Sequence, residues 1–145
     1  MRKKYSQHKS NARKRGIPSI LTFEEFKSLK LSDCFYCGVE RMFLEFFFPK
    51  MGLNYPPTMT IDRRNNKEGY TSFNCVPSCA ICNRIKGEFL LWEEQLEISQ
   101  NYIKPKYDLW RQEMLEEYGE WCEQNVLLDE ELEEFNEWPE ENEDI

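Results

Sequence analysis

Two pairs of cysteines offer the clearest chemistry in this sequence. Cys34 and Cys37 are separated by two residues, and Cys79 and Cys82 repeat that spacing. Two thiolates three positions apart in a tight turn can reach one ion at about 2.3 Å, and two such pairs complete the tetrahedron that zinc prefers. Because four protein ligands leave no open position for a reacting water, we predict a structural zinc ion. The alternative is two unrelated pairs on the surface.

The other two cysteines, Cys75 and Cys122, fall outside this spacing. Cys75 lies four residues before Cys79 and could compete as a ligand, but we expect both to be small buried hydrophobic residues. The basic N-terminus has no apolar run behind it, and the chain has no stretch of about eighteen apolar residues, so neither a signal peptide nor a membrane span is expected. We therefore expect a cytoplasmic protein, where metal binding or free thiols are commoner than disulfides.

One carboxylate stands in a basic neighbourhood, in the stretch TIDRRNN. Asp62 follows a short β-prone run and precedes two arginines and two asparagines. It is either the acidic centre of a catalytic site or part of an ordinary hairpin, where it would pair with Arg64 or cap the turn. Further along, Asn83 could cap the start of a helix, and Arg84 and Lys86 could contact phosphate or form a solvated face.

The segments around these residues predict elements that bring them together. Residues 58–63 read as a strand, 65–69 as a turn and 70–76 as a returning strand, and the second cysteine pair opens a helix over 80–86. This order, fastened at its base by zinc, would bring Asp62, Asn74 and Asn83 close to one another. Forty-one residues lie between the cysteine pairs, so a folded segment is expected there.

The remaining residues predict mainly helices. Residues 2–15 carry seven Lys and Arg and no acid, which indicates a basic arm or short helix. Thr22 and Glu25 form a capping box for a helix through Lys30. The aromatic run over 43–48 is expected to pack in the core or else to form a partner-binding patch.

Beyond the second cysteine pair, helices are predicted over 91–103, ended by Pro105, and over 107–122. A third short piece places Leu128, Leu132 and Phe135 on one face.

Charge divides the chain into two parts. All 19 Lys and Arg lie in residues 1–111, where 12 acidic residues leave a net charge of +7. The last 34 residues hold 15 acidic residues and no basic one, which gives −15 there and −8 for the whole chain. A basic body suits a polyanion such as DNA. The acidic segment is expected to be solvated or to bind a protein, with masking of the basic body and DNA mimicry as alternatives.

At these residues the sequence resembles a known family. The run TIDRRNNKEGYTSFNCVPSCAICNRIKG resembles the core of the HNH endonucleases, the ββα-metal nucleases, and RKRGIPSILTFEEFKSLKLSDCFYCG resembles the leader of their zinc-containing phage and bacterial members. The resemblance covers residues 11–88. It implies a zinc-stapled HNH-like domain of the α+β class, which we place over 22–104. From the charge pattern we expect a basic arm over 1–21 before this domain and an acidic helical extension over 105–145 after it. A phage-encoded member would act in the bacterial host cytoplasm.

The resemblance also implies roles for individual residues. Asp62 would be the carboxylate ligand of a catalytic Mg²⁺ or Mn²⁺ ion, Asn83 a second ligand and Asn74 a loop clamp. Arg63 stands at the position of the family's general-base histidine. An arginine stays charged near neutral pH, so it cannot take a proton from water, although it can clamp a phosphate. The expected phosphate contacts are Arg64, Arg84, Lys86, Arg13, Lys14 and Arg15.

Two functions of different class follow from these observations. One is a metal-dependent DNA endonuclease that acts through Asp62 and Asn83, with weak activity because of position 63. The other is a non-catalytic module with the same zinc fold, which binds nucleic acid or, through its acidic helices, a host protein.

Overall fold

The computed structural model describes residues 1–119 and combines helices with one small sheet. Contacts within the chain divide it into two units, Met1–Asp108 and Leu109–Ile145. The elements are α1 (Arg2–Lys14), α2 (Phe23–Leu31), η1 (Arg41–Phe43), α3 (Leu44–Lys50), β1 (Thr60–Arg63), β2 (Cys75–Ser78), α4 (Ala80–Lys86), α5 (Trp92–Ile98), η2 (Ser99–Ile103) and α6 (Lys104–Tyr118). The predicted α+β class is confirmed, whereas the domain boundaries at residues 21 and 104 remain predictions.

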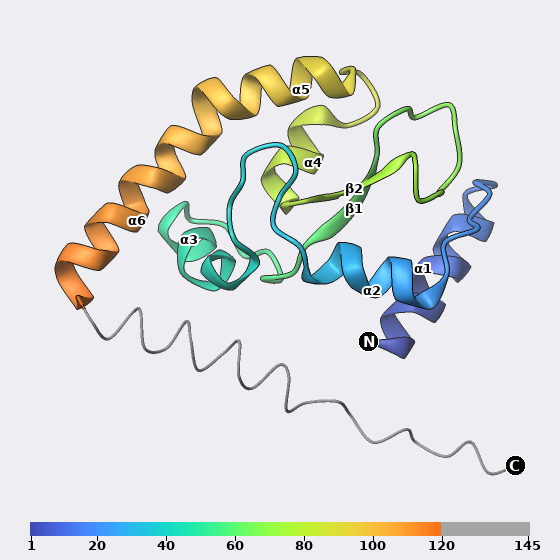
Figure 1. The fold of residues 1–145 in the computed structure, drawn as a ribbon, viewed down its shortest axis with the longest axis horizontal. Coiled ribbons are helices and arrows are strands. Elements are labelled where there is room, and N and C mark those ends of the chain that lie inside the picture. The colour runs from blue at the N-terminus through green and yellow to red at the C-terminus, as the bar shows by residue number, and fades with distance from the viewer. Residues whose placement is uncertain (120–145) are drawn as a thin grey trace, which may run out of the picture. The chain divides into compact units, whose positions relative to one another are not determined.

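The sheet is a single antiparallel hairpin, and both α2 and α4 contact it (Figure 1). Thr60 pairs with Ser78 and Asp62 with Val76. The returning strand begins five residues later than predicted, because the backbone N–H groups of Asn74 and Cys75 both turn back to the carbonyl of Thr71. That turn removes residues 71–74 from the ladder.

Side chains of β1 alternate between two environments, as the two-residue period of a strand requires. Ile61 packs against the buried cluster formed by Ala12, Leu21, Tyr70 and Cys75. Thr60 and Asp62 instead contact Asn83 and Lys86 of α4. One face of the strand therefore belongs to the core, and the other belongs to the helix that follows the second cysteine pair.

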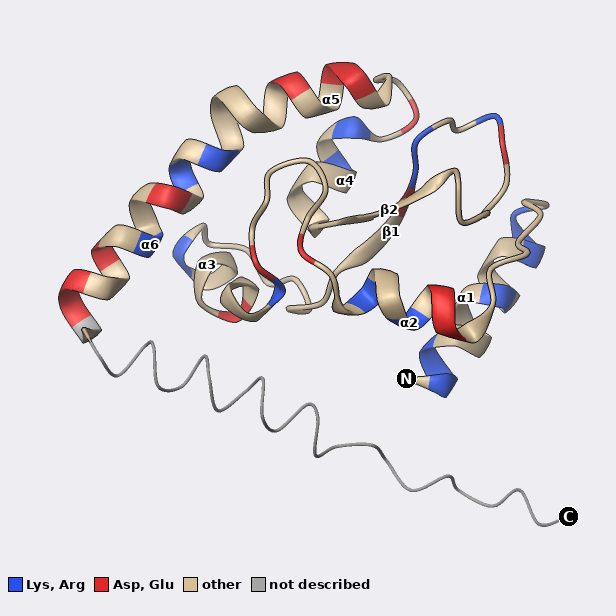
Figure 2. Cartoon of the chain, viewed as in Figure 1, with Lys and Arg blue, Asp and Glu red and all other residues tan. Residues whose placement is uncertain are grey.

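The basic N-terminal segment forms a helix that packs on α2. Ala12 is buried, and the Tyr5 hydroxyl donates to the carbonyl of Leu21 at 2.7 Å. The ring of His8 lies 4.6 Å from that of Tyr70. Burial lowers the pKa of His8, with help from the charge of Lys9. Figure 2 shows the Lys and Arg residues of α1 spread along a helix that carries no acidic side chain.

Local sequence signals account for α2 and α3. Thr22 caps α2, and the reciprocal bonds between Thr22 and Glu25 form the predicted capping box. The aromatic run forms α3 and the turn before it, and Phe47 lies 5.2 Å from the ring of Tyr107. Because Leu44, Phe47 and Phe48 are buried, most of this run packs in the core.

The chain after α4 passes Pro105 without the predicted break. The helix opens into one π turn over Ser99–Ile103, and Pro105 then lies in the first turn of α6. The helix is continuous from Trp92 past Pro105, and the π turn directly before the proline, in which the Lys104 N–H returns to the Ser99 carbonyl, changes the backbone bonding where the proline supplies no N–H. The predicted end at Pro105 is therefore wrong. None of the helices within residues 1–119 is long and apolar enough to cross a membrane.

Candidate metal centre and nucleic-acid site

The two cysteine pairs meet in a buried cluster, as predicted. The sulfur atoms of Cys34, Cys37, Cys79 and Cys82 all lie within 4.8 Å of one another. The backbone N–H of Cys79 donates to the Cys34 sulfur at 3.2 Å, and that of Cys82 donates to the Cys79 sulfur at 3.5 Å. Such donors stabilise thiolates, the form that binds a metal. Four buried sulfurs with N–H donors fit a structural zinc ion.

Local turns bring each pair into position. Gly38 follows the first pair with φ of +72°, a conformation that glycine adopts readily, and its N–H returns to the Cys34 carbonyl at 2.8 Å. Cys79 is itself the N-cap of α4, which places Cys82 in the first turn of that helix. Cys75 lies outside the cluster in the hydrophobic core, and burial raises its pKa to about 11. Cys122 lies outside the described residues.

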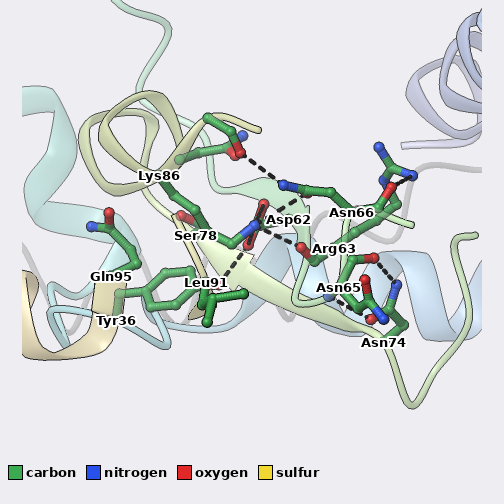
Figure 3. A network of polar contacts seen from close by, with 12 residues as sticks. Tyr36, Asp62, Arg63, Asn65, Asn66, Asn74, Ser78, Lys86, Leu91 and Gln95 are labelled. Atoms are coloured by element: carbon green, nitrogen blue, oxygen red, sulfur yellow. Dashed lines mark hydrogen bonds and ion pairs between the residues drawn. The ribbon is translucent and has the colours of Figure 1, made fainter. Parts of the chain in front are cut away.

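Asp62 is the centre of a buried polar network (Figure 3). Its Oδ2 accepts a hydrogen bond of 2.5 Å from the Tyr36 hydroxyl. The ammonium of Lys86, which is fully buried, lies 3.3 Å from both carboxylate oxygens. Lys86 also donates to the Arg63 carbonyl at 2.8 Å and to Asn66 Oδ1 at 3.2 Å. Burial raises the pKa of Asp62, while Tyr36 and then Lys86 oppose that rise.

Arg63 faces the loop that follows β1. Its guanidinium donates to the carbonyls of Asn66 at 3.0 Å and Glu68 at 2.9 Å, and it lies over the Tyr70 ring at 5.3 Å. Tyr70 belongs to the buried cluster against which Ile61 of β1 packs. Asp62 and Arg63, adjacent in sequence, therefore point to opposite sides of the strand and make separate contacts.

Asn74 holds the same loop closed. Its Nδ2 donates to the carbonyls of Asn65 and Gly69, both at 3.0 Å, and its Oδ1 accepts from the Asn65 N–H at 2.9 Å. The side chain is 5% exposed, so water cannot replace these bonds. This geometry is that of a clamp across residues 65–69.

Replacing Asn74 with alanine should weaken the whole unit. Three hydrogen bonds to backbone groups would be lost, and at about 0.5–1.5 kcal/mol each the free energy of unfolding should fall by about 2–4 kcal/mol. Urea denaturation measures the change. Asn65→Ala, whose exposed side chain bonds Glu68 and the N–H of Lys67, is the control and should cost under about 1 kcal/mol. Equal losses would contradict the clamp.

Asn83 lies at an open pocket beside the start of β1. Its amide donates to the Thr60 hydroxyl at 3.0 Å. The pocket has a volume of about 270 Å³ and is lined by Tyr55, Thr60, Ala80, Asn83 and Arg84. The Arg84 guanidinium donates to the Tyr55 hydroxyl at 2.5 Å. Amide, hydroxyl and guanidinium groups thus converge on one concave surface.

The other expected phosphate contacts are dispersed. Arg13, Lys14 and Arg15 are exposed at the end of α1. Arg64 lies over the Trp92 ring at 5.5 Å and donates to the Phe73 carbonyl. Lys86 faces Asp62 inside the fold rather than solvent.

In this arrangement Asp62, one of the two expected ligands of a catalytic cation, already has other partners. Both carboxylate oxygens of Asp62 are engaged by Lys86 and Tyr36, and the residue is 5% exposed. A divalent cation requires free oxygen ligands, and Lys86 already supplies the positive charge beside Asp62. Asn83, by contrast, reaches the pocket.

Two residues of this region were not singled out from the sequence. Tyr36 lies inside the first cysteine pair, where only the cysteine spacing carried a signal, and Tyr55 lies in the segment between Gly52 and Pro56. The contact of Tyr36 with Asp62 spans 26 residues of sequence. No local pattern marks such a contact.

Comparison with known proteins shows what this chain is similar to in sequence and in structure. No family model matches the chain. Over 84 residues, 57% of the chain, it is 37% identical to the uncharacterized protein R423 of Acanthamoeba polyphaga mimivirus, of which it spans 13%. The structure is similar to that of the rare-cutting HNH restriction endonuclease PacI, with a TM-score of 0.61 and 26% identity, covering 70% of this chain and 75% of that one. The chain therefore combines helices, a two-stranded sheet and a four-cysteine metal-binding cluster in a fold similar to that of an HNH nuclease.

Proposed function

We propose that this chain is a DNA endonuclease of the HNH type, which hydrolyses phosphodiester bonds with the help of Mg²⁺ or Mn²⁺. The observation that carries the proposal is the pocket at which α4 presents Asn83 and Arg84 beside Thr60 and Tyr55. A guanidinium and neighbouring donors suit a phosphate group, and the similar structure belongs to an enzyme that cuts DNA.

Exposed basic side chains at the pocket and at the end of another helix support binding to the DNA backbone. Arg84 is exposed at the pocket, and Arg13, Lys14 and Arg15 are exposed on α1. Such residues neutralise phosphates without reading sequence. Arg64 is half-buried and can add to this surface, whereas Lys86 is omitted from the proposed contacts because it is fully buried.

The metal is proposed because phosphodiester hydrolysis needs positive charge beside the phosphate and the leaving oxygen. Asp62 and Asn83 are its expected ligands. With Asp62 held by Lys86 and Tyr36, a cation would have to compete with an ammonium group for the carboxylate. We therefore expect weak activity.

A second function is favoured by the internal contacts of Asp62 and Arg63. Both side chains make contacts that stabilise the fold, and neither lines the pocket. A chain that used them only in this way would keep its surface for nucleic acid while lacking catalysis. A protein partner is also expected for the acidic extension over 105–145, of which residues 120–145 lie outside the described residues.

Plasmid nicking by the full chain distinguishes the two functions. We expect slow nicking that requires added Mg²⁺ or Mn²⁺, and a loss of about 10²-fold in Asn83→Ala, the scale on which one positioned polar group acts at a reacting oxygen. Tyr102→Phe, an exposed tyrosine of η2, is the control and should nick like the wild type.

DNA binding is measured on the same samples by fluorescence anisotropy at several salt concentrations. Binding that weakens with salt, in a protein that does not nick with either metal, would establish the second function and overturn the first. Nicking that persists unchanged in Asn83→Ala would show that the pocket is not the reactive site.

A further inference from the structure

Two side-chain hydroxyls from outside the cysteine motifs contact the sulfur cluster. The Ser99 Oγ lies 3.3 Å from the Cys82 sulfur, and the Tyr107 hydroxyl lies 3.7 Å from the Cys79 sulfur. Both hydroxyls come from the helices that follow α4, Ser99 from the π turn η2 and Tyr107 from α6. The second cysteine pair is thus covered by a segment that supplies no metal ligand.

The direction of these hydrogen bonds follows from the chemistry of a bound metal. A cysteine that ligates zinc is a thiolate, which has no proton and can only accept. The two hydroxyls must then donate. Ser99 and Tyr107 are 0% and 1% exposed, so water cannot compete for their protons.

A buried glutamine completes the arrangement on the serine side. Gln95 is fully buried, and its Nε2 donates to the Ser99 Oγ at 2.8 Å. Because the serine oxygen accepts this bond, its own proton is directed to Cys82. The π turn matters here because it begins at Ser99, four residues after Gln95, and π turns commonly occur at functional positions.

On the tyrosine side, packing fixes the ring. Tyr107 lies 5.2 Å from the Phe47 ring of α3. The phenol is therefore held between the aromatic core and the sulfur cluster. A zinc ion with four thiolates carries a net charge of −2, and buried donors reduce the cost of keeping that charge away from water.

We propose that Ser99 and Tyr107 are positioning residues of the metal centre, which donate to the Cys82 and Cys79 thiolates and thereby fasten the segment from Gln95 to Tyr107 to the bound zinc. Retention of the metal and the placement of this segment then depend on each other. The inference concerns the metal centre alone and stands whether or not the chain cuts DNA.

The test compares Ser99→Ala and Tyr107→Phe with wild type in the full chain. Zinc transfer to a chromogenic chelator should show affinity weakened by about 10–100-fold in each variant, the range found when partners of metal ligands are removed. Tyr102→Phe, 69% exposed in the same π turn, is the matched control and should retain zinc like the wild type.

A second measurement separates donation to sulfur from general loosening. In Co²⁺-loaded protein, the sulfur-to-metal charge-transfer band should shift in Ser99→Ala and Tyr107→Phe, because each thiolate loses a donor. Phe47→Leu, which disturbs the packing of Tyr107 without removing a donor, should leave the band in place. Faster zinc loss with an unshifted band, or affinities within about twofold of wild type, would overturn the proposal.

Discussion

Replacing both Cys34 and Cys79 with serine is expected to unfold the Met1–Asp108 unit. Each cysteine belongs to a different pair, so the double variant leaves one thiolate on each side of the cluster. Structural zinc contributes about 10–16 kcal/mol in zinc-finger peptides, which matches or exceeds the 5–15 kcal/mol by which a typical domain is stable. Circular dichroism and metal analysis should show loss of helix together with loss of zinc, and a strong chelator should do the same to wild type.

Cys75→Ser is the matched control for this experiment. Cys75 is buried like the ligands but lies in the core cluster with Ala12, Leu21 and Tyr70. Serine there should cost about 1–3 kcal/mol for a buried hydroxyl and leave the zinc content unchanged. A metal-free protein that melts like the zinc-loaded one would contradict a structural role for the ion.

The parts of the fold that could be predicted are those whose sequence patterns lie within a few consecutive residues. The two cysteine spacings, the capping box of α2 and the helix after Cys79 each depend on local geometry, and the structure confirms all three. The hairpin was predicted for the same reason. Its second strand was misplaced because the strand pattern outweighed a turn at Thr71, whose carbonyl accepts two backbone N–H groups and whose hydroxyl accepts the Asn74 N–H.

The parts that could not be predicted depend on contacts between remote residues. From the sequence, Lys86 was predicted to be an exposed cation. Only the packing of α4 on β1 directs its side chain toward Asp62. Arg63 and Asp62 were predicted to act in one site, whereas the alternation of side chains along β1 places them on opposite faces of the strand. Pro105 read as a helix end, since a π turn before it has no signature in the sequence.

Lys86→Met is expected to destabilise the protein by about 3–5 kcal/mol, the cost of removing one partner from a buried ion pair. Methionine keeps most of the side-chain volume, so the loss reports on the charge of Asp62, which would remain buried beside Tyr36. Urea denaturation with Lys104→Met as control gives the comparison. Lys104 pairs with Asp108 at 2.5 Å, but both side chains are over 40% exposed, and such pairs contribute under about 1 kcal/mol.

The double variant Asp62→Asn with Lys86→Met isolates the interaction between these two side chains. Replacing both charges removes the uncompensated ion, so most of the lost stability should return. Asp62→Asn alone should cost less than Lys86→Met, because the Lys86 ammonium would keep the Arg63 carbonyl and Asn66 Oδ1 as acceptors. Additive losses in the double variant would mean that the two residues act independently.

The pH dependence of the free energy of unfolding of Lys86→Met identifies why this variant is less stable than wild type. Burial already raises the pKa of Asp62, and Lys86 opposes that rise. An acid with a raised folded pKa contributes stability that is present below the unfolded pKa and is lost as pH rises through the folded pKa. Without Lys86 the pKa of Asp62 should rise further. The loss in free energy of unfolding relative to wild type should therefore be large near about pH 7 and shrink toward about pH 4. A deficit that stays constant across this range would indicate lost packing, and it would remove the reason to place a charged Asp62 at the centre of this network.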